Sequence, residues 1–199
     1  MDNTLLRRLL IDEEGYNLRA HRVKGVWHIG IGHNLEIEQT EEELAILGAY
    51  TLETVHELEL TEQQCYALFD LDVADALEDV QPTFMPDGLE ALGETRRAIL
   101  LSMVFQCGGR GFRAFKKFIA AVKAGDFTTA ADEMLDSKAA REDSPARWER
   151  ASFAMRHGYF KEYADEHPRR DASTTVSSAL ANVSDDALVA ELTRRIKKK

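Results

Sequence analysis

Cysteine is scarce in this sequence, and long apolar runs are missing. The two cysteines, Cys65 and Cys107, lie far apart, with no CxxC motif or histidine-rich neighbourhood around them. We therefore expect two buried thiols rather than a disulfide. No apolar run approaches the roughly 18 residues that a membrane span needs, so no span is expected. The six histidines lack the spacing of metal ligands, which predicts neither a metal site nor a cofactor.

Lysine and arginine are absent from residues 25–95, although acidic residues are frequent there. The formal net charge of the whole chain is −10. Nucleic acid is not expected as a partner, because binding to phosphate depends on cationic side chains. The first residues also lack the order of a secretory signal, so we expect synthesis in a cytoplasm.

The N-terminal part combines a helix with a small sheet. Leucines at helical spacing predict a helix over residues 3–14, and Gly15 follows as the residue that ends it. A carboxylate, that of Glu14, therefore lies at a helix C-terminus. Residues 18–34 predict a small antiparallel sheet with a hairpin turn at Lys24-Gly25.

Residues 26–34 alternate like a single strand with two different faces. One face, which we expect to belong to the core, carries Trp27, Ile29, Ile31 and His33. The other face offers bare backbone and one imidazole, and it carries His28, Gly30 and Gly32. A carboxylate at a helix end, followed by such a hairpin, is typical of a cleft that binds a polymer.

The remaining helices begin at recognisable caps. Two capping boxes, Thr40-Glu41-Glu42-Glu43 and Thr61-Glu62-Gln63-Gln64, open a short helix through Leu47 and a long one that ends at Gln81-Pro82. An apolar helix over 96–105 is ended by the glycines of 108–111. Shorter helices are expected at 113–123, 127–136 and 145–157, the last with Ser144 as its cap, Pro145 in its first turn and Gly158 at its end.

The C-terminal residues differ in composition from the rest. Residues 166–183 are rich in Ser, Thr and Ala and are predicted to be a linker. Residues 184–199 predict an amphipathic helical tail with an acidic start and a basic end, which suits the helix dipole. Its apolar stripe could dock on the parent domain or on a protein partner.

Four separated strings carry a resemblance to a known family. Ile11-Asp12-Glu13-Glu14-Gly15, Trp27-His28-Ile29-Gly30-Ile31-Gly32-His33, Met103-Val104-Phe105-Gln106 and Ser144-Pro145-Ala146-Arg147 occur in the order found in T4-type phage lysozymes, glycoside hydrolase family 24. The resemblance covers roughly residues 3–165. It implies an α+β, mostly α fold over 1–165, with a small β-hairpin lobe, a long connecting helix and a helical C-terminal lobe.

The resemblance also implies a function. The family consists of muramidases that hydrolyse the β-1,4 bond between N-acetylmuramic acid and N-acetylglucosamine in bacterial peptidoglycan. We expect a phage-encoded monomer, which a holin releases to the wall or a virus particle carries there. Peptidoglycan is anionic, so the acidic stretch argues against strong electrostatic capture but not against the chemistry.

Glu14 is the candidate general acid, because its pair with Gly15 matches the acid-glycine pair of the family and glycoside hydrolysis needs a carboxylic acid as proton donor. Resemblance gives it Arg147 as a partner. The negative helix end favours a protonated carboxyl and the arginine favours an ionised one, so sequence does not fix the balance. The alternative is a solvated helix-end glutamate like Asp12 and Glu13, with Arg147 no different from Arg150.

The second catalytic group of the family is missing. The family places an acid, sometimes a cysteine, nine positions after the glutamate, where this chain has Val23, and then a threonine, where it has His28. A neutral imidazole at His28 could activate water as a base or act as a nucleophile. The N-acetyl group of the substrate could assist instead, with Glu14 as the only essential residue. The rival hypothesis is a non-catalytic wall-binding or virion structural module with an exposed histidine.

Resemblance assigns roles to a few further residues. His33 is expected to pair with Asp72 on the long helix and to stabilise the fold. The expected sugar-binding positions are Asn34, Phe105, Gln106 and Glu133.

Overall fold

The computed structural model describes residues 3–84, 88–142 and 144–163. The chain divides into two units, Met1–Phe160 and Lys161–Lys199, and the helices and strands described below belong to the first. The second has one described element, a 3-10 helix over Lys161–Tyr163. The predicted linker 166–183 and tail helix 184–199 lie outside the described residues.

A three-stranded antiparallel sheet follows the first helix, α1 (Thr4–Glu14). Its strands β1 (Asn17–Val23), β2 (Val26–Gly30) and β3 (His33–Asn34) pair in sequence order. Lys24 and Gly25 both have positive φ in the predicted hairpin turn, the backbone that a two-residue turn between twisted strands requires.

The single strand predicted over 26–34 is wrong. The chain turns at Ile31-Gly32 between β2 and β3, and His33 returns opposite Ile29. His33 still lies on the same face as Ile29, because directly paired residues of an antiparallel sheet point to the same side. Gly32 allows the turn, since its φ of 76° is readily adopted only by glycine.

Helix α2 (Glu41–Leu47) and the long helix α3 (Glu62–Phe84) both begin at the predicted capping boxes. Thr40 Oγ1 accepts from the Glu43 backbone N–H, and Thr61 Oγ1 accepts in the same way from Gln64. The predicted end of α3 at Pro82 is wrong, because the helix continues through this proline to Phe84. Phe84 lies one helical turn beyond Val80, and both side chains are buried.

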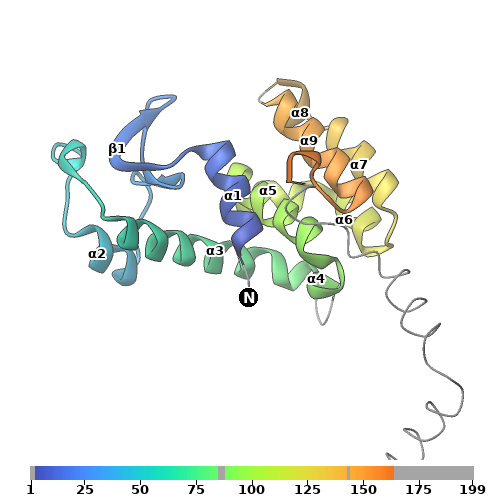
Figure 1. Ribbon diagram of the computed structural model, residues 1–199, viewed down its shortest axis with the longest axis horizontal. Coiled ribbons are helices and arrows are strands. Elements are labelled where there is room, and N and C mark those ends of the chain that lie inside the picture. The colour runs from blue at the N-terminus through green and yellow to red at the C-terminus, as the bar shows by residue number, and fades with distance from the viewer. Residues whose placement is uncertain (1–2, 85–87, 143, 164–199) are drawn as a thin grey trace, which may run out of the picture. The chain divides into compact units, whose positions relative to one another are not determined.

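The rest of the unit is helical, and it includes the long helix α5 (Gly93–Ala114) (Figure 1). Gly108 has non-helical backbone (φ 67°, ψ 165°), so the first helical segment of α5 ends there as predicted, and a second segment follows the kink and ends at Ala114. The other helices are α4 (Gly88–Ala91), α6 (Lys116–Lys123), α7 (Phe127–Leu135), α8 (Lys138–Glu142) and α9 (Pro145–His157). The short helix α8 was not predicted from the sequence.

Two local predictions about α9 and the cysteines need correction. Ser144 precedes α9, but its hydroxyl caps no backbone N–H; its carbonyl accepts from Trp148 instead. Cys65 is buried as predicted, whereas Cys107 is only half-buried and donates to the Met103 carbonyl. Both thiols are free.

The elements pack in a way that confirms the α+β, mostly helical class. The sheet and α2 pack against α3, while α1 and α9 both pack against α5. The helical core includes the fully buried side chains of Phe112, Phe118 and Trp148. Among the described helices, none has the length and apolar character needed to cross a membrane. The packing brings the C-terminal end of α1 to the start of α9.

Candidate active site

Glu14 is the last residue of α1, and Arg147 in the first turn of α9 contacts it. Arg147 Nη1 donates to Glu14 Oε1 at 2.5 Å. The Glu14 side chain is 29% exposed and that of Arg147 only 13%, so the carboxylate remains accessible while the guanidinium is largely buried. The two residues are 133 positions apart, and the packing of α1 and α9 around α5 brings them together.

Glu13, next to it, is a buried carboxylate rather than the solvated one expected. Its side chain is 2% exposed, and it accepts from Ser102 Oγ at 2.8 Å. Arg147 Nη2 lies 2.9 Å from one of its oxygens, and Arg150 Nη2 lies 3.2 Å from the other. Burial raises the pKa of Glu13, although Arg147, the Ser102 hydroxyl and Arg150 act in the opposite direction.

Sequence reasoning missed Glu13, Ser102 and Arg150 as members of this cluster. Arg147 shares its two terminal nitrogens between Glu13 and Glu14, and its Nη2 also donates to the carbonyl and hydroxyl of Ser102. The available indication was the spacing of Arg147 and Arg150, which are three residues apart and therefore lie on one helix face. Two adjacent acids facing two arginines on one face is a pattern that sequence can suggest.

The glycine face of the hairpin is not the open surface expected. A Cβ on Gly32 would lie 3.0 Å from Glu14 Cβ, so the Glu14 side chain occupies the space that this glycine leaves. A Cβ on Gly30 would meet the buried Cys65 sulfur at 3.4 Å. Gly32 therefore seats Glu14 against the sheet, while Gly30 allows close packing on α3.

His28 lies half-buried on β2, opposite His21 of β1 and Asn34 of β3. Its Nδ1 lies 3.1 Å from the Val26 carbonyl oxygen. A carbonyl only accepts, so Nδ1 carries the hydrogen. In neutral His28 the lone pair is therefore on Nε2, the form that a base needs. Val23 ends β1 with its side chain 43% exposed, and it offers no polar group.

The expected sugar-binding residues fall into separate places. Asn34 follows the turn, and its Oδ1 accepts from the Glu36 backbone N–H. Phe105 and Gln106 lie half-buried on α5, with the Phe105 ring 6.2 Å from that of Phe69. Glu133 of α7 lines a cavity of about 660 Å³. Neither Glu14 nor His28 lines that cavity, whose other walls include Phe115, Lys117, Lys138 and Glu142.

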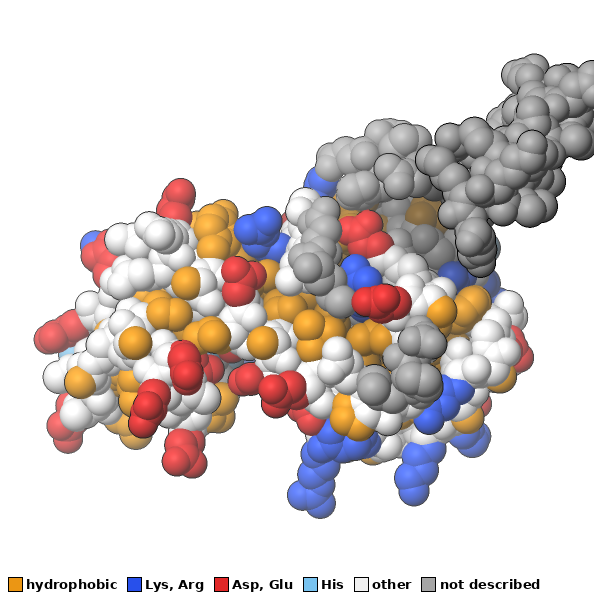
Figure 2. All heavy atoms as spheres, turned by 90° about the horizontal axis from the view of Figure 1, so that it is seen from below, with side chains coloured by type: hydrophobic (Ala, Val, Ile, Leu, Met, Phe, Trp, Pro, Cys, Tyr) orange, Lys and Arg blue, Asp and Glu red, His pale blue; other side chains and the backbone are white. Residues whose placement is uncertain are grey.

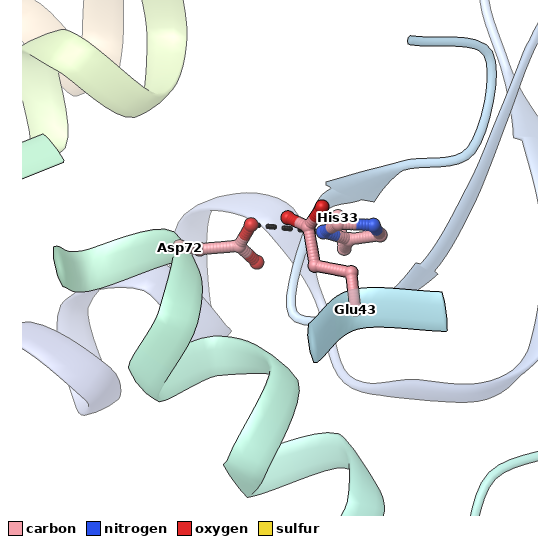
Figure 3. Close-up of side chains that lie close together, drawn as sticks. All are labelled: His33, Glu43 and Asp72. Carbon is pink, nitrogen blue, oxygen red and sulfur yellow. Dashed lines mark hydrogen bonds and ion pairs between the residues drawn. The ribbon is translucent and has the colours of Figure 1, made fainter. Parts of the chain in front are cut away.

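Buried His33 pairs with half-buried Asp72 beneath the sheet, and Glu43 of α2 lies beside them (Figure 3). His33 Nδ1 lies 2.8 Å from Asp72 Oδ1. Burial of the imidazole opposes its charge, but the hydrogen bond and charge of Asp72 outweigh this, so the pKa of His33 is raised. Burial also raises the pKa of Asp72, although His33 acts in the opposite direction.

A long helix joins a small sheet to a helical region, and an arginine of α9 holds a carboxylate at the end of α1. These features define a protein of the lysozyme-like class. The chain belongs to the phage lysozyme family, because a family model described as phage lysozyme matches residues 12–147. The match includes Glu14, the hairpin and Arg147.

One relative is similar to this chain over most of the relative's own length. This is "Probable T4-type lysozyme 2" of Dictyostelium discoideum, which is 26% identical over 166 residues, covering 79% of this chain and 97% of the relative. The family and this relative support a lysozyme-like muramidase in general, with peptidoglycan as the substrate that the family implies.

Proposed function

We propose that this protein hydrolyses the β-1,4 bond between N-acetylmuramic acid and N-acetylglucosamine in bacterial peptidoglycan, with Glu14 as general acid. The contact between Glu14 and Arg147 carries this proposal. This contact holds the accessible carboxyl of Glu14 at a helix end, and the Glu14 side chain packs against Gly32. From this position the carboxyl is able to protonate a leaving oxygen.

His28 is our candidate for the group that activates water. The hydrogen bond from Nδ1 to Val26 fixes the ring and leaves Nε2 as the base. Activation of water by His28 inverts the anomeric carbon, whereas a nucleophilic His28 retains its configuration. Assistance by the substrate N-acetyl group would make His28 dispensable.

Release of soluble muropeptides from purified peptidoglycan tests these roles. Wild type is compared with Glu14→Gln and His28→Ala, and the new reducing ends and their anomeric configuration are identified. We expect Glu14→Gln to lose at least about a thousandfold in rate and His28→Ala about a hundredfold or more. A His28→Ala protein with full rate would assign water activation to the substrate.

The second candidate function is a non-catalytic wall-binding or virion structural module. Val23 favours it, because an isopropyl group cannot activate water. Sedimentation with purified wall distinguishes the two functions. Wild type that sediments with wall but releases no muropeptide from several wall types would overturn the enzyme and establish the binding module.

The source and delivery of the protein also belong to this proposal. We expect a phage-encoded protein that reaches the wall through a holin lesion or as part of a virus particle. Release of muropeptides from the walls of cells that express the protein, with and without a holin, measures whether delivery depends on the holin. Release without any holin would contradict the first route.

A further inference from the structure

Three potential metal ligands meet beneath the sheet although they come from three separate elements. His33 is in β3, Glu43 in α2 and Asp72 in α3, and one donor atom from each lies within 4.8 Å of the others. Figure 3 shows that the two carboxylates and the imidazole point toward one another. His33 is 3% exposed and Glu43 is 4% exposed, whereas the Asp72 side chain is 18% exposed, so two of the three ligands are buried and the third is half-buried.

Gln39 fixes which nitrogen of His33 faces this cluster. Gln39 Nε2 donates to the carbonyls of Asn34 and Ile37, which places its Oε1 2.7 Å from His33 Nε2. This amide oxygen only accepts, so His33 Nε2 carries a hydrogen. The remaining nitrogen, Nδ1, faces Asp72. A histidine that ligates a metal normally donates its other ring N–H in this way, and the contact holds the ring in place.

Glu43 is the second observation that indicates a ligand. Its Oε2 accepts from the Thr40 backbone N–H, but within the described part of the chain no donor reaches Oε1 and no Lys or Arg pairs with the carboxylate. Glu43 is only 4% exposed, and a nearby cation would stabilise its carboxylate. One protonated imidazole between two carboxylates leaves a net charge of −1, whereas a divalent cation with neutral imidazole makes the cluster neutral.

We propose that His33, Glu43 and Asp72 bind a divalent transition-metal ion, with Zn²⁺ as the best match. One imidazole nitrogen and two carboxylate oxygens suit Zn²⁺, whereas Mg²⁺ and Ca²⁺ prefer oxygen ligands alone. Tetrahedral Zn²⁺ needs ligand atoms about 3.4 Å apart, so atoms that start as much as 4.8 Å apart must close by up to about 1.4 Å through side-chain rotation. The ion takes the place of the proton between Nδ1 and Asp72, and water completes its coordination.

A metal here links the sheet and α2 to α3. Because the unfolded chain does not hold the three ligands together, binding stabilises the folded state. The ion is structural and independent of Glu14, so the proposal stands whether or not the protein cleaves peptidoglycan.

Titration of the chelator-treated full chain with Zn²⁺ tests the site. Calorimetry should give one ion per chain, and saturation should raise the melting temperature by about 4 °C or more. Glu43→Gln should weaken binding by at least about tenfold, and Asp72→Asn likewise. Gln at position 43 retains an acceptor for the Thr40 N–H, so α2 keeps its capping box. The matched control is Glu42→Gln, an exposed position on the same helix, which should bind like wild type.

Co²⁺ in place of Zn²⁺ gives a second measurement, since its visible absorption reports coordination by the protein. The spectrum should be present in wild type and Glu42→Gln and lost in Glu43→Gln. Equal affinity of wild type and Glu43→Gln would overturn the proposal, as would the absence of binding at millimolar Zn²⁺. Binding that His21→Ala abolishes and Glu43→Gln leaves intact would place the ion at the imidazoles of His21 and His28 and would equally overturn it.

Discussion

Glu13 and Glu14 are adjacent in the chain but differ in environment. Glu13 is 2% exposed and is held by Ser102, Arg147 and Arg150, while Glu14 is 29% exposed and shares only Arg147 with it. Glu13 therefore fixes the position of Arg147, and Arg147 in turn holds Glu14. One carboxylate is buried within the cluster, and the other is the accessible one to which we assign the proposed proton transfer.

Glu13→Gln should destabilise the protein by about 2–4 kcal/mol, because it leaves Arg147 and Arg150 without a buried counter-charge. The amide still accepts from Ser102, so the loss reports the charge rather than the shape. Urea unfolding measures the change. Glu149→Gln, an exposed glutamate between the two arginines, should change stability by less than about 0.5 kcal/mol. Equal effects of the two substitutions would contradict the role of Glu13.

The raised pKa of His33 predicts a stability that depends on pH. Asp72 of α3 and Glu43 of α2 face this imidazole, and the pair with Asp72 favours its protonated form. A raised histidine pKa contributes stability that is fully present below the ordinary value of 6.5 and is lost as pH rises through the folded-state value. In chelator, wild type should lose stability relative to His33→Asn above pH 6.5, by at most about 1.4 kcal/mol per pH unit. A constant difference between the two proteins across this range would contradict the prediction.

Individual residues show how far a sequence can predict a site. The resemblance to T4-type phage lysozymes predicted both partners of the contact between α1 and α9, Glu14 and Arg147. The burial of Glu13 was not predicted, because its cause is the approach of α5 and α9 rather than any local pattern. Glu43 illustrates the same limit, since its capping role was evident in the sequence and its position beside His33 was not.

The turn between β2 and β3 forms one wall of the space that the Glu14 side chain occupies. Gly32 and Gly48, at the end of α2, both have a φ of 76°. A side chain on Gly32 would meet Glu14 at 3.0 Å, whereas nothing lies within 4 Å of a Cβ on Gly48. The two glycines therefore separate the cost of the backbone conformation from the cost of displacing Glu14.

Gly48→Ala should destabilise the protein by about 1 kcal/mol and leave muropeptide release unchanged, because it changes the backbone cost alone. Gly32→Ala should cost about 2–4 kcal/mol and should lower release by at least about tenfold, because the methyl group displaces Glu14. Thermal unfolding and initial rates measure both effects. Full activity in Gly32→Ala would show that catalysis does not require the packing of Glu14 against Gly32.

Helix and strand boundaries followed local patterns where those patterns were strong. The two capping boxes located the starts of α2 and α3, and Gly158 ended α9 as expected. The errors arose where packing overrides local preference. Burial of Phe84 carries α3 past Pro82, and a second helical segment that was not expected as part of the same helix follows the kink at Gly108.

Charge is divided unevenly over the molecule. Acidic side chains dominate the end that carries the sheet and α2, while lysines and arginines project from the helical end (Figure 2). This follows from the sequence, since residues 25–95 contain no lysine or arginine. With a net charge of −10 the protein should be repelled by an anionic wall.

Salt should therefore accelerate wall cleavage. Raising ionic strength from about 0.01 to 0.15 M shortens the screening length from about 30 to 8 Å and should increase the initial rate on purified peptidoglycan at least about twofold. An uncharged soluble oligosaccharide should show no such dependence. A rate that falls with salt on the wall would mean that the basic helical end governs capture.

The sequence by itself determined the class of fold, the family and the charge pattern. The fold class and the charge pattern depend on local caps, periodicity and composition, which are encoded by neighbouring residues, and the family was indicated by the resemblance of four short strings to T4-type phage lysozymes. Only the tertiary structure decided which carboxylate is buried, where Gly32 seats Glu14, and that His33, Glu43 and Asp72 converge. Those features depend on contacts between elements far apart in the chain, and no local pattern specifies the distance between two side chains that packing brings together.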